Sequence, residues 1–395
     1  MPQIKPDVEA FARIKVIGIG GSGKNAVNHM INSKVKGVEF IAINTDAQDL
    51  HNSHASKKIH IGKNLTRGLG TGMNPDLGKR AAEETKEEIQ EALKGADMVF
   101  LAYGAGGGTG SGAGPTISKI AKEMGILTVS VVTKPFFFEG IQRMKIAEQS
   151  LEELRNGVDA LIIIPNDRLL STISRETTAK QAFAMCDDIL KQAVEGISDL
   201  ITMPGIINTD FADIRAIMEN AGSALMGIGI AGGENRAIEA AKLAISSPLL
   251  ELSIAGAKGV LFSIAGGDDL TMFEIQDAAK LITESIDPNA KVIFGTVHDE
   301  RLKKNEVKIT VIASGFSDVT NKKSLFQNIN TNKEEERKGK LFGGFSTNAP
   351  VEKESRIETQ ISQAPIVEDK KNIKTDFDDD NDWGAVPAFL RRQKK

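Results

Sequence analysis

The chain has 395 residues, 41% of them hydrophobic, which is enough to fill the cores of two or three domains. Its 49 basic and 53 acidic residues leave a formal net charge of −4, which excludes the broad basic surface of a nucleic-acid-binding protein. The single cysteine, Cys186, excludes a disulfide framework. The start, MPQIKPDVEAF, lacks a signal-peptide core, and no run approaches the ~20 apolar residues of a membrane span, so we expect a cytoplasmic protein that does not insert into membranes.

Residues 1–177 alternate short apolar runs with helical segments. RIKVIGIG (13–20) predicts a buried strand, and further strands are expected in VEFIAINTD, ADMVFLAYG, ILTVSVVTK and DALIIIPND. KNAVNHMINS predicts a helix, and NPDLGKRAAEETKEEIQEALKG predicts one helix with Pro75 in its first turn and Gly95 at its end. This alternation indicates a Rossmann-like parallel sheet, in which ligands bind beyond the carboxyl ends of the strands.

Residues 178–202 carry apolar side chains at helical spacing, which predicts a central helix of about 37 Å that links two domains. Beyond it, two helical patterns alternate with KGVLFSIAGG, AKVIFGTVHD and NEVKITVIASG, so residues 203–316 are expected to form a smaller α/β domain. Residues 317–380 contain few large apolar residues and are interpreted as a disordered linker. Residues 381–395 include DWGAVPAFLRRQKK, where apolar residues return at helical spacing, and are interpreted as a partner-binding peptide.

Two glycine loops are the main chemical signal. KVIGIGGSGKN (15–25) fits a dinucleotide fingerprint through Gly18, Gly20 and Gly23, and also a P-loop that fails because Asn25 replaces Ser or Thr. YGAGGGTGSGAGP (103–115) lies between a predicted strand and the helix TISKIAKEM, where its backbone N–H groups can converge on an anion. A dehydrogenase has one such loop per dinucleotide, and a P-loop enzyme has one Walker A loop. Two phosphate loops on adjacent strands therefore fit neither class.

These segments resemble the tubulin/FtsZ family. The segment GGGTGSG (106–112) is the signature of the family, and GIGGSGKNAVNHM, AINTDAQ, GLGTGMNP, KPFFFEG, IPNDRLL and NTDFADIR occur in order over roughly residues 12–316. The resemblance, which is to the bacterial cell-division branch, implies a GTPase with GTP/GDP and Mg²⁺ as cofactors. It also implies head-to-tail homopolymers that form the division ring at midcell beneath the membrane.

The resemblance also implies the roles of individual residues. Three loops, including GLGTG (68–72), surround the phosphates, Glu139 and Arg143 contact the ribose and α-phosphate region, and Asp187 reads guanine beside the ring of Phe183. The implied GTP-binding residues are Gly21, Ser22, Gly23, Lys24, Asn25, Thr71, Gly72, Gly107, Gly108, Thr109, Gly110, Thr133, Glu139, Arg143, Asn166, Phe183 and Asp187. Lys24 departs from the family pattern and is expected to point to solvent.

Several of these residues can also be interpreted as purely structural. Phe183 at helical spacing is more often a core residue, and Glu139 with Arg143, four residues apart, is more often a surface ion pair. His51, His54 and His60 lack a second ligand cluster, so a polar loop is favoured over a metal site.

NTDFADIR supplies the implied catalytic residues Asn208, Asp210 and Asp213. The predicted helix of about 37 Å separates them from the glycine loops, so they are not expected to reach the nucleotide of their own molecule. The resemblance implies that they complete the nucleotide site of the next subunit. Taken alone, Asp residues at this spacing more often cap a helix.

The C-terminal segment VPAFLRR resembles the peptide by which the family recruits membrane-tethering and regulatory division proteins. The implied contact residues are Val386, Pro387, Phe389, Leu390 and Arg391.

Two other functions compete with the GTPase. An NAD-dependent oxidoreductase is suggested by the first loop with Asp46, although no substrate-side base stands out. A membrane-tethered partitioning or scaffold protein of the same superfamily is disfavoured by VPAFLRR.

Overall fold

The computed structural model describes residues 12–170, 176–203, 205–247, 250, 253–299 and 301–316. The predicted linker (317–380) and C-terminal peptide (381–395), with Val386, Pro387, Phe389, Leu390 and Arg391, lie outside the described residues.

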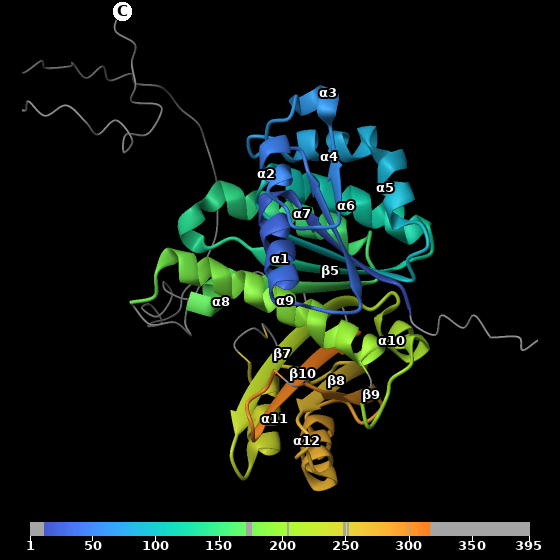
Figure 1. Cartoon of the computed structure of the whole chain (residues 1–395), viewed down its shortest axis with the longest axis vertical. Coiled ribbons are helices and arrows are strands. Elements are labelled where there is room, and N and C mark those ends of the chain that lie inside the picture. The colour runs from blue at the N-terminus through green and yellow to red at the C-terminus, as the bar shows by residue number, and fades with distance from the viewer. Residues whose placement is uncertain are drawn as a thin grey trace, which may run out of the picture. The chain divides into compact units, whose positions relative to one another are not determined.

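Within these residues, ten strands form one sheet in the order β3-β2-β1-β4-β5-β6-β7-β10-β8-β9. The last four strands of this order, β7, β10, β8 and β9, are labelled in Figure 1. The first six strands along the chain pair in parallel: β1 (Ile14–Ile19), β2 (Val38–Asn44), β3 (Lys57–His60), β4 (Met98–Gly104), β5 (Leu127–Lys134) and β6 (Ala160–Pro165). The strand order reverses beside β1, with β2 on one side and β4 on the other, and such a reversal opens a crevice at the carboxyl ends of the strands. The predicted Rossmann-like parallel sheet is confirmed.

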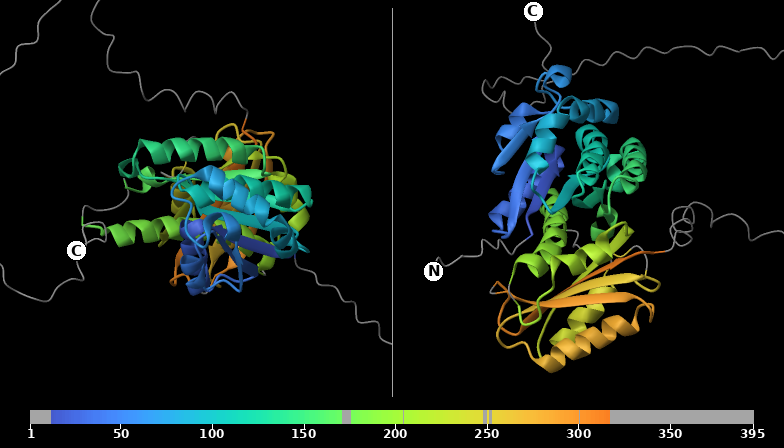
Figure 2. Two further views of the ribbon diagram at one scale, coloured as in Figure 1. Left: turned by 90° about the horizontal axis from the view of Figure 1, so that it is seen from above. Right: turned by 90° about the vertical axis from the view of Figure 1, so that its right-hand side faces the viewer.

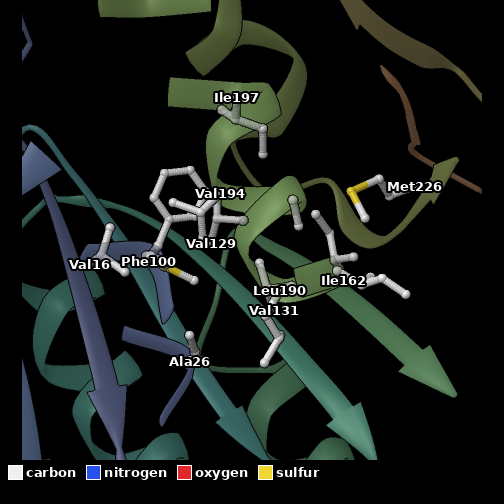
Figure 3. Close-up of a cluster of buried hydrophobic side chains, with 14 of the residues drawn as sticks. Val16, Ala26, Phe100, Val129, Val131, Ile162, Leu190, Val194, Ile197 and Met226 are labelled. Atoms are coloured by element: carbon white, nitrogen blue, oxygen red, sulfur yellow. The ribbon is translucent and has the colours of Figure 1, made fainter. Parts of the chain in front are cut away.

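Helices cover both faces of this parallel region because successive apolar side chains of each strand point to opposite faces of the sheet. Along β1, Val16 belongs to one hydrophobic cluster, while Ile17 and Ile19 belong to another. The first cluster contains α1 (Gly20–Asn32) and α9 (Ala179–Thr202), and Figure 3 shows Leu190 and Val194 of α9 beside strand side chains such as Val131. The second cluster contains α4 (Pro75–Glu84), α5 (Lys86–Leu93), α6 (Gly108–Glu123) and α7 (Ile141–Arg155).

The second half of the sheet carries its own core. β7 (Gly222–Gly232) is parallel to β6 and antiparallel to β10 (Glu306–Ser314), which in turn pairs with β8 (Gly259–Gly266), and β8 is parallel to β9 (Lys291–His298). The helices α11 (Arg236–Ile245) and α12 (Met272–Glu284) pack together against these strands (Figure 2). The shorter elements are α2 (Ala47–His51), α3 (Lys63–Thr66), a 3₁₀ turn η1 (Phe137–Glu139), α8 (Asn166–Leu170) and α10 (Phe211–Met218).

The predicted central helix is present as α9, which has 24 residues and therefore spans about 36 Å. Thr178 caps its start: the Thr178 hydroxyl accepts from Gln181 N, while the Gln181 side chain accepts from Thr178 N. Among the described residues, no helix combines the length and apolar character needed to cross a bilayer.

Three features differ from the sequence prediction. The helix predicted over NPDLGKRAAEETKEEIQEALKG is two helices, because Thr85 leaves helical geometry (φ −107°, ψ 20°). The second glycine loop is largely helical, since α6 already begins at Gly108. The strand β7 was not predicted because GSALMGIGIAG is rich in small residues; a Cβ on Gly227 or Gly229 would meet carbonyl oxygens of α11.

We predict that Gly23→Ala lowers the free energy of unfolding by about 2–3 kcal/mol. Gly23 packs α1 against β4, and a Cβ there would meet the carbonyl oxygen of Ala102 and lie 2.8 Å from the backbone carbon of Gly18. Gly70→Ala is the control, because a Cβ on Gly70 meets nothing within 4 Å. Urea unfolding of both variants checks the prediction, and equal stabilities would contradict it.

Candidate functional site

A cavity of about 340 Å³ lies where the strand order reverses. It is lined by residues that follow the carboxyl ends of four parallel strands and by one face of α9. The lining residues are Ile19, Gly20, Gly21, Ser22, Asn25, Thr71, Gly104, Ala105, Gly107, Gly108, Thr109, Gly110, Thr133, Pro135, Glu139, Arg143, Asn166, Phe183, Cys186, Asp187 and Leu190. The chain therefore gathers segments as distant as residues 19 and 190 around one space.

Two helix N-termini form one wall of the cavity. α1 begins at Gly20 and α6 at Gly108, and neither start has a side-chain cap or an acidic residue in its first turn. Their first backbone N–H groups and the positive ends of two helix dipoles are thus available to an anion. The two loops are joined by Ser22, whose Oγ accepts a 2.8 Å hydrogen bond from Gly104 N. This wall suits phosphate.

Polar groups after β5 and β6 line the middle of the cavity. Glu139 and Arg143 form the ion pair that their spacing of four residues indicates, with Arg143 Nη1 2.9 Å from Glu139 Oε2. Both residues also line the cavity. Asn166, the first residue of α8, is 6% exposed, and its Oδ1 has no hydrogen-bond donor among the residues that the structure describes. A buried acceptor without a donor is costly, so the Asn166 oxygen fits a ligand that supplies a hydroxyl or an N–H group.

The far wall belongs to α9. Phe183 is 48% exposed, so the core interpretation of this residue is wrong; its ring packs edge-on against Phe136 with centroids 5.5 Å apart. Asp187 lies one turn further along the same face. Burial raises the pKa of Asp187 to about 6, although His29 and Lys24 partly oppose the shift. A ring and a carboxylate on one helix face can stack on a planar base and accept hydrogen bonds from its edge.

Lys24 does not point to solvent, so that expectation is wrong. Its side chain is buried, with Nζ 2.6 Å from Oδ1 of Asp49. A cation near the N-terminal end of α1 opposes the helix dipole, and the carboxylate of Asp49 offsets this cost.

The cavity contains most of the predicted nucleotide-binding residues. Gly23, Lys24 and Gly72 do not line it. The sequence analysis missed Ile19, Gly20, Gly104, Ala105, Pro135, Cys186 and Leu190. Helical spacing could have identified two of them, because Cys186 and Leu190 share a face with Phe183 and Asp187. Burial raises the pKa of the Cys186 thiol to about 12, so this cysteine is a packing residue and not a nucleophile.

Asn208, Asp210 and Asp213 do not line the cavity, and all three are exposed on the segment that follows α9. Asp210 caps α10 by accepting from Ala212 N at 3.1 Å, and Asn208 Oδ1 accepts from Gly205 N at 2.8 Å. Asp213 stands in the first turn of α10. The helix-cap interpretation therefore accounts for Asp210, and the folded chain does not itself bring the three side chains to the cavity.

Two of the three histidines make local hydrogen-bonding contacts. His60 Nε2 lies 3.0 Å from the Thr45 carbonyl oxygen, and His54 Nδ1 lies 3.2 Å from Asn32 Oδ1. Within the described ranges, no group of three or more His, Cys, Asp or Glu side chains could hold a metal ion.

Comparison with known proteins matches both halves of the described fold. Residues 13–175 match the GTPase domain of the tubulin/FtsZ family, and residues 222–317 match the C-terminal domain of the FtsZ family. An empty FtsZ dimer from M. jannaschii is 45% identical, with a TM-score of 0.74 over 77% of this chain and 88% of that one. A point mutant of that FtsZ gives 45% identity and a TM-score of 0.75, over 78% and 92%. CetZ2 from Haloferax volcanii, a GTPγS-bound protofilament, shares the fold at 20% identity and a TM-score of 0.66, over 79% and 96%.

We predict that Asp187→Asn stabilises the ligand-free protein above pH 6. The native state keeps a proton on Asp187 up to a pKa of about 6, whereas the unfolded chain releases it near 3.8. The native state therefore binds more protons in this window, and the contribution of Asp187 to stability falls as pH rises through it. The asparagine variant lacks this loss.

The adjacent Asp188 is the matched control with the opposite sign. Burial opposes the shift, but hydrogen bonds from Lys191 and His29 hold the pKa of Asp188 below its ordinary value. Asp188→Asn should therefore destabilise the protein at neutral pH. Urea unfolding at a series of pH values checks both variants, and effects of the same sign at neutral pH would contradict the assignment.

Proposed function

Because this chain belongs to the FtsZ branch of the tubulin/FtsZ family, we propose that it is a GTP-dependent filament protein that builds the bacterial division ring. Family membership supports GTP binding and GTPase activity in general. The proposal adds guanine selection in the cavity, head-to-tail assembly, and a catalytic site completed by the neighbouring subunit.

The observation that carries the nucleotide assignment is that the two ends of the cavity carry different chemical groups. Two uncapped helix N-termini lie at one wall and suit phosphates, while the carboxylate of Asp187 and the ring of Phe183 lie at the other. Guanine presents two donors, N1–H and N2–H₂, and a carboxylate supplies two acceptors. Adenine lacks this pair of donors, so a carboxylate at the base end of the cavity favours GTP. Asn166 and the Glu139–Arg143 pair also line the cavity, and we assign them to the ribose and the α-phosphate.

We propose that Mg²⁺ binds mainly through the phosphates of the nucleotide and not through protein side chains. The described residues offer no carboxylate cluster for it, and Mg²⁺ commonly binds through substrate phosphates and water. When bound, it would neutralise phosphate charge.

Two exposed apolar sets support head-to-tail assembly. Phe137, Phe138 and Ile141 follow β5 beside the cavity residues Glu139 and Arg143, and each is at least two-thirds exposed. Ile206, on the segment after α9, is 72% exposed, and Met272 and Phe273 at the start of α12 are similarly exposed. Phe137, Phe138 and Ile141 are close in sequence, and exposed apolar residues that cluster in this way mark interaction sites. Contact between the two sets on successive subunits would bring NTDFADIR to the next cavity.

Hydrolysis would then depend on assembly. The exposed Asn208, Asp210 and Asp213 would enter the neighbour's cavity and orient the attacking water, a positioning role that phosphoryl transfer generally requires. We further propose that the C-terminal peptide docks on membrane-tethering and regulatory division proteins and so places the filament at the midcell. Residues 1–177, 178–202 and 203–316 are proposed as the nucleotide-binding domain, the linking helix and the assembly domain.

We predict that the protein retains GTP in preference to ATP and NAD, and that Asp187→Ala removes the preference for guanine. Losing two hydrogen bonds to a charged acceptor should weaken GTP binding by about 100-fold. The measurement is nucleotide retention after gel filtration for each ligand. Unchanged selectivity in the variant would contradict the guanine assignment, and retention of NAD by the wild type would favour an oxidoreductase.

We predict that Asp213→Ala retains GTP but hydrolyses it at least about 100-fold more slowly, because a positioned catalytic group is lost. Mixed with wild-type protein, the variant should lower the rate per wild-type subunit, since each site needs a neighbour. Asp287→Ala is the control, because Asp287 is exposed and caps a turn beyond the other end of α12. Loss of nucleotide from the Asp213 variant as a monomer would refute completion by a neighbour.

A further inference from the structure

Three threonine hydroxyls meet at the phosphate wall of the cavity. Thr45 follows β2, Thr109 stands in the first turn of α6, and Thr71 belongs to the loop before α4. The Oγ1 of Thr109 lies 2.9 Å from Thr45 Oγ1 and 3.4 Å from Thr71 Oγ1. Thr71 and Thr109 line the cavity, whereas Thr45 is fully buried and does not. The role of Thr45 is therefore the open question.

The backbone of Thr45 is fixed on both sides. Its N–H donates to Asn44 Oδ1 at 2.9 Å. Its carbonyl oxygen lies 3.0 Å from His60 Nε2 and 3.4 Å from the hydroxyl of Thr66, which also lies 3.2 Å from the carbonyl oxygen of Gly62. The side chain of Thr45 is also fully buried, and its hydroxyl oxygen lies 2.9 Å from the hydroxyl oxygen of Thr109.

Proton counting gives this contact a direction. A hydroxyl group has one hydrogen, and a nucleotide's phosphate oxygens act here as acceptors. If Thr109 donates its hydrogen to phosphate, its oxygen can only accept from Thr45, so Thr45 must be the donor in the pair. A donor held in place at Thr45 thus orients the hydrogen of Thr109 toward the cavity.

We propose that Thr45 is a positioning residue for the nucleotide's phosphates, acting through the hydroxyl of Thr109. This inference rests on the proposed nucleotide-binding function and adds a residue that does not touch the ligand. It also connects the phosphate wall to β3, because His60 at the end of that strand anchors the Thr45 carbonyl.

The test is a double-mutant cycle with Thr45→Val, Thr109→Val and the double variant. Thr45→Val keeps the shape of the side chain and removes the donor, so we expect triphosphate affinity to fall by about 3- to 10-fold. In the Thr109→Val background the same change should have no further effect on affinity. Thr45→Ser, which keeps the hydroxyl, should restore binding. Guanosine, which has no phosphate, should bind all variants equally.

Thr128→Val is the matched control for the loss of a buried threonine hydroxyl. Thr128 is fully buried near the start of β5, and its hydroxyl donates to Ile126 O at 2.9 Å, away from the cavity. It should lower thermal stability without changing nucleotide affinity.

The outcomes separate the inference from the function on which it rests. Equal losses from Thr45→Val in both backgrounds, or no loss in either, would overturn the positioning role. The affinities in the cycle are measured with the triphosphate that the wild type retains. If that triphosphate is ATP, the guanine assignment is overturned, and the cycle measured with ATP still tests the role of Thr45. A wild-type protein that retains no triphosphate would overturn both.

Discussion

The site depends on one constraint: two helices must begin at the same edge of a parallel sheet, close enough for their N-termini to converge. The reversal of strand order beside β1 brings α1 and α6 together, and small residues allow the approach. Gly20 adopts φ +70°, a left-handed conformation that glycine tolerates best, where β1 turns into α1. Gly23 then lets α1 lie directly on β4. A side chain at Gly23 would separate the elements that form the phosphate wall.

This arrangement conflicts with the rules that make helices stable. The long helix α9 carries a full capping box at Thr178, whereas α1 and α6 begin without a side-chain cap. A cap such as Ser or Asp typically stabilises a helix by about 1 kcal/mol, but its oxygen would occupy the N–H groups that an anion needs. The buried acceptor of Asn166 and the raised pKa of Asp187 are costs of the same kind. In the proposed function, a bound nucleotide would relieve both costs.

Much of the fold and the cavity could be predicted because the relevant signals are local in sequence. β-Branched runs that end in glycine located β1, and the spacing of Phe183 and Asp187 placed both on one helix face. Features set by tertiary contacts could not be predicted. Thr85 breaks a favourable helical pattern while its hydroxyl accepts from Gly62 N and donates to Ala81 O. Lys24 was expected in solvent because it departs from the family pattern; its partner, Asp49, lies on another helix, and the local sequence does not indicate this contact. The contact between Thr45 and Thr109 spans 64 residues of chain, and neither residue alone indicates it.

α9 links the two halves of the proposed mechanism. Its N-terminal half lines the cavity through Phe183 and Asp187, and the segment after its C-terminus carries Asn208 and Asp213. The part of α9 from Asp187 to its last residue, Thr202, spans about 22 Å of helix. In the proposed filament, a carboxylate beyond the end of α9 therefore serves the neighbour's cavity and not the one that α9 lines. Because the helix is buried along much of its length and capped at its start, it resists bending toward its own site. In the proposed filament, the stiffness of α9 is therefore what ties hydrolysis to assembly.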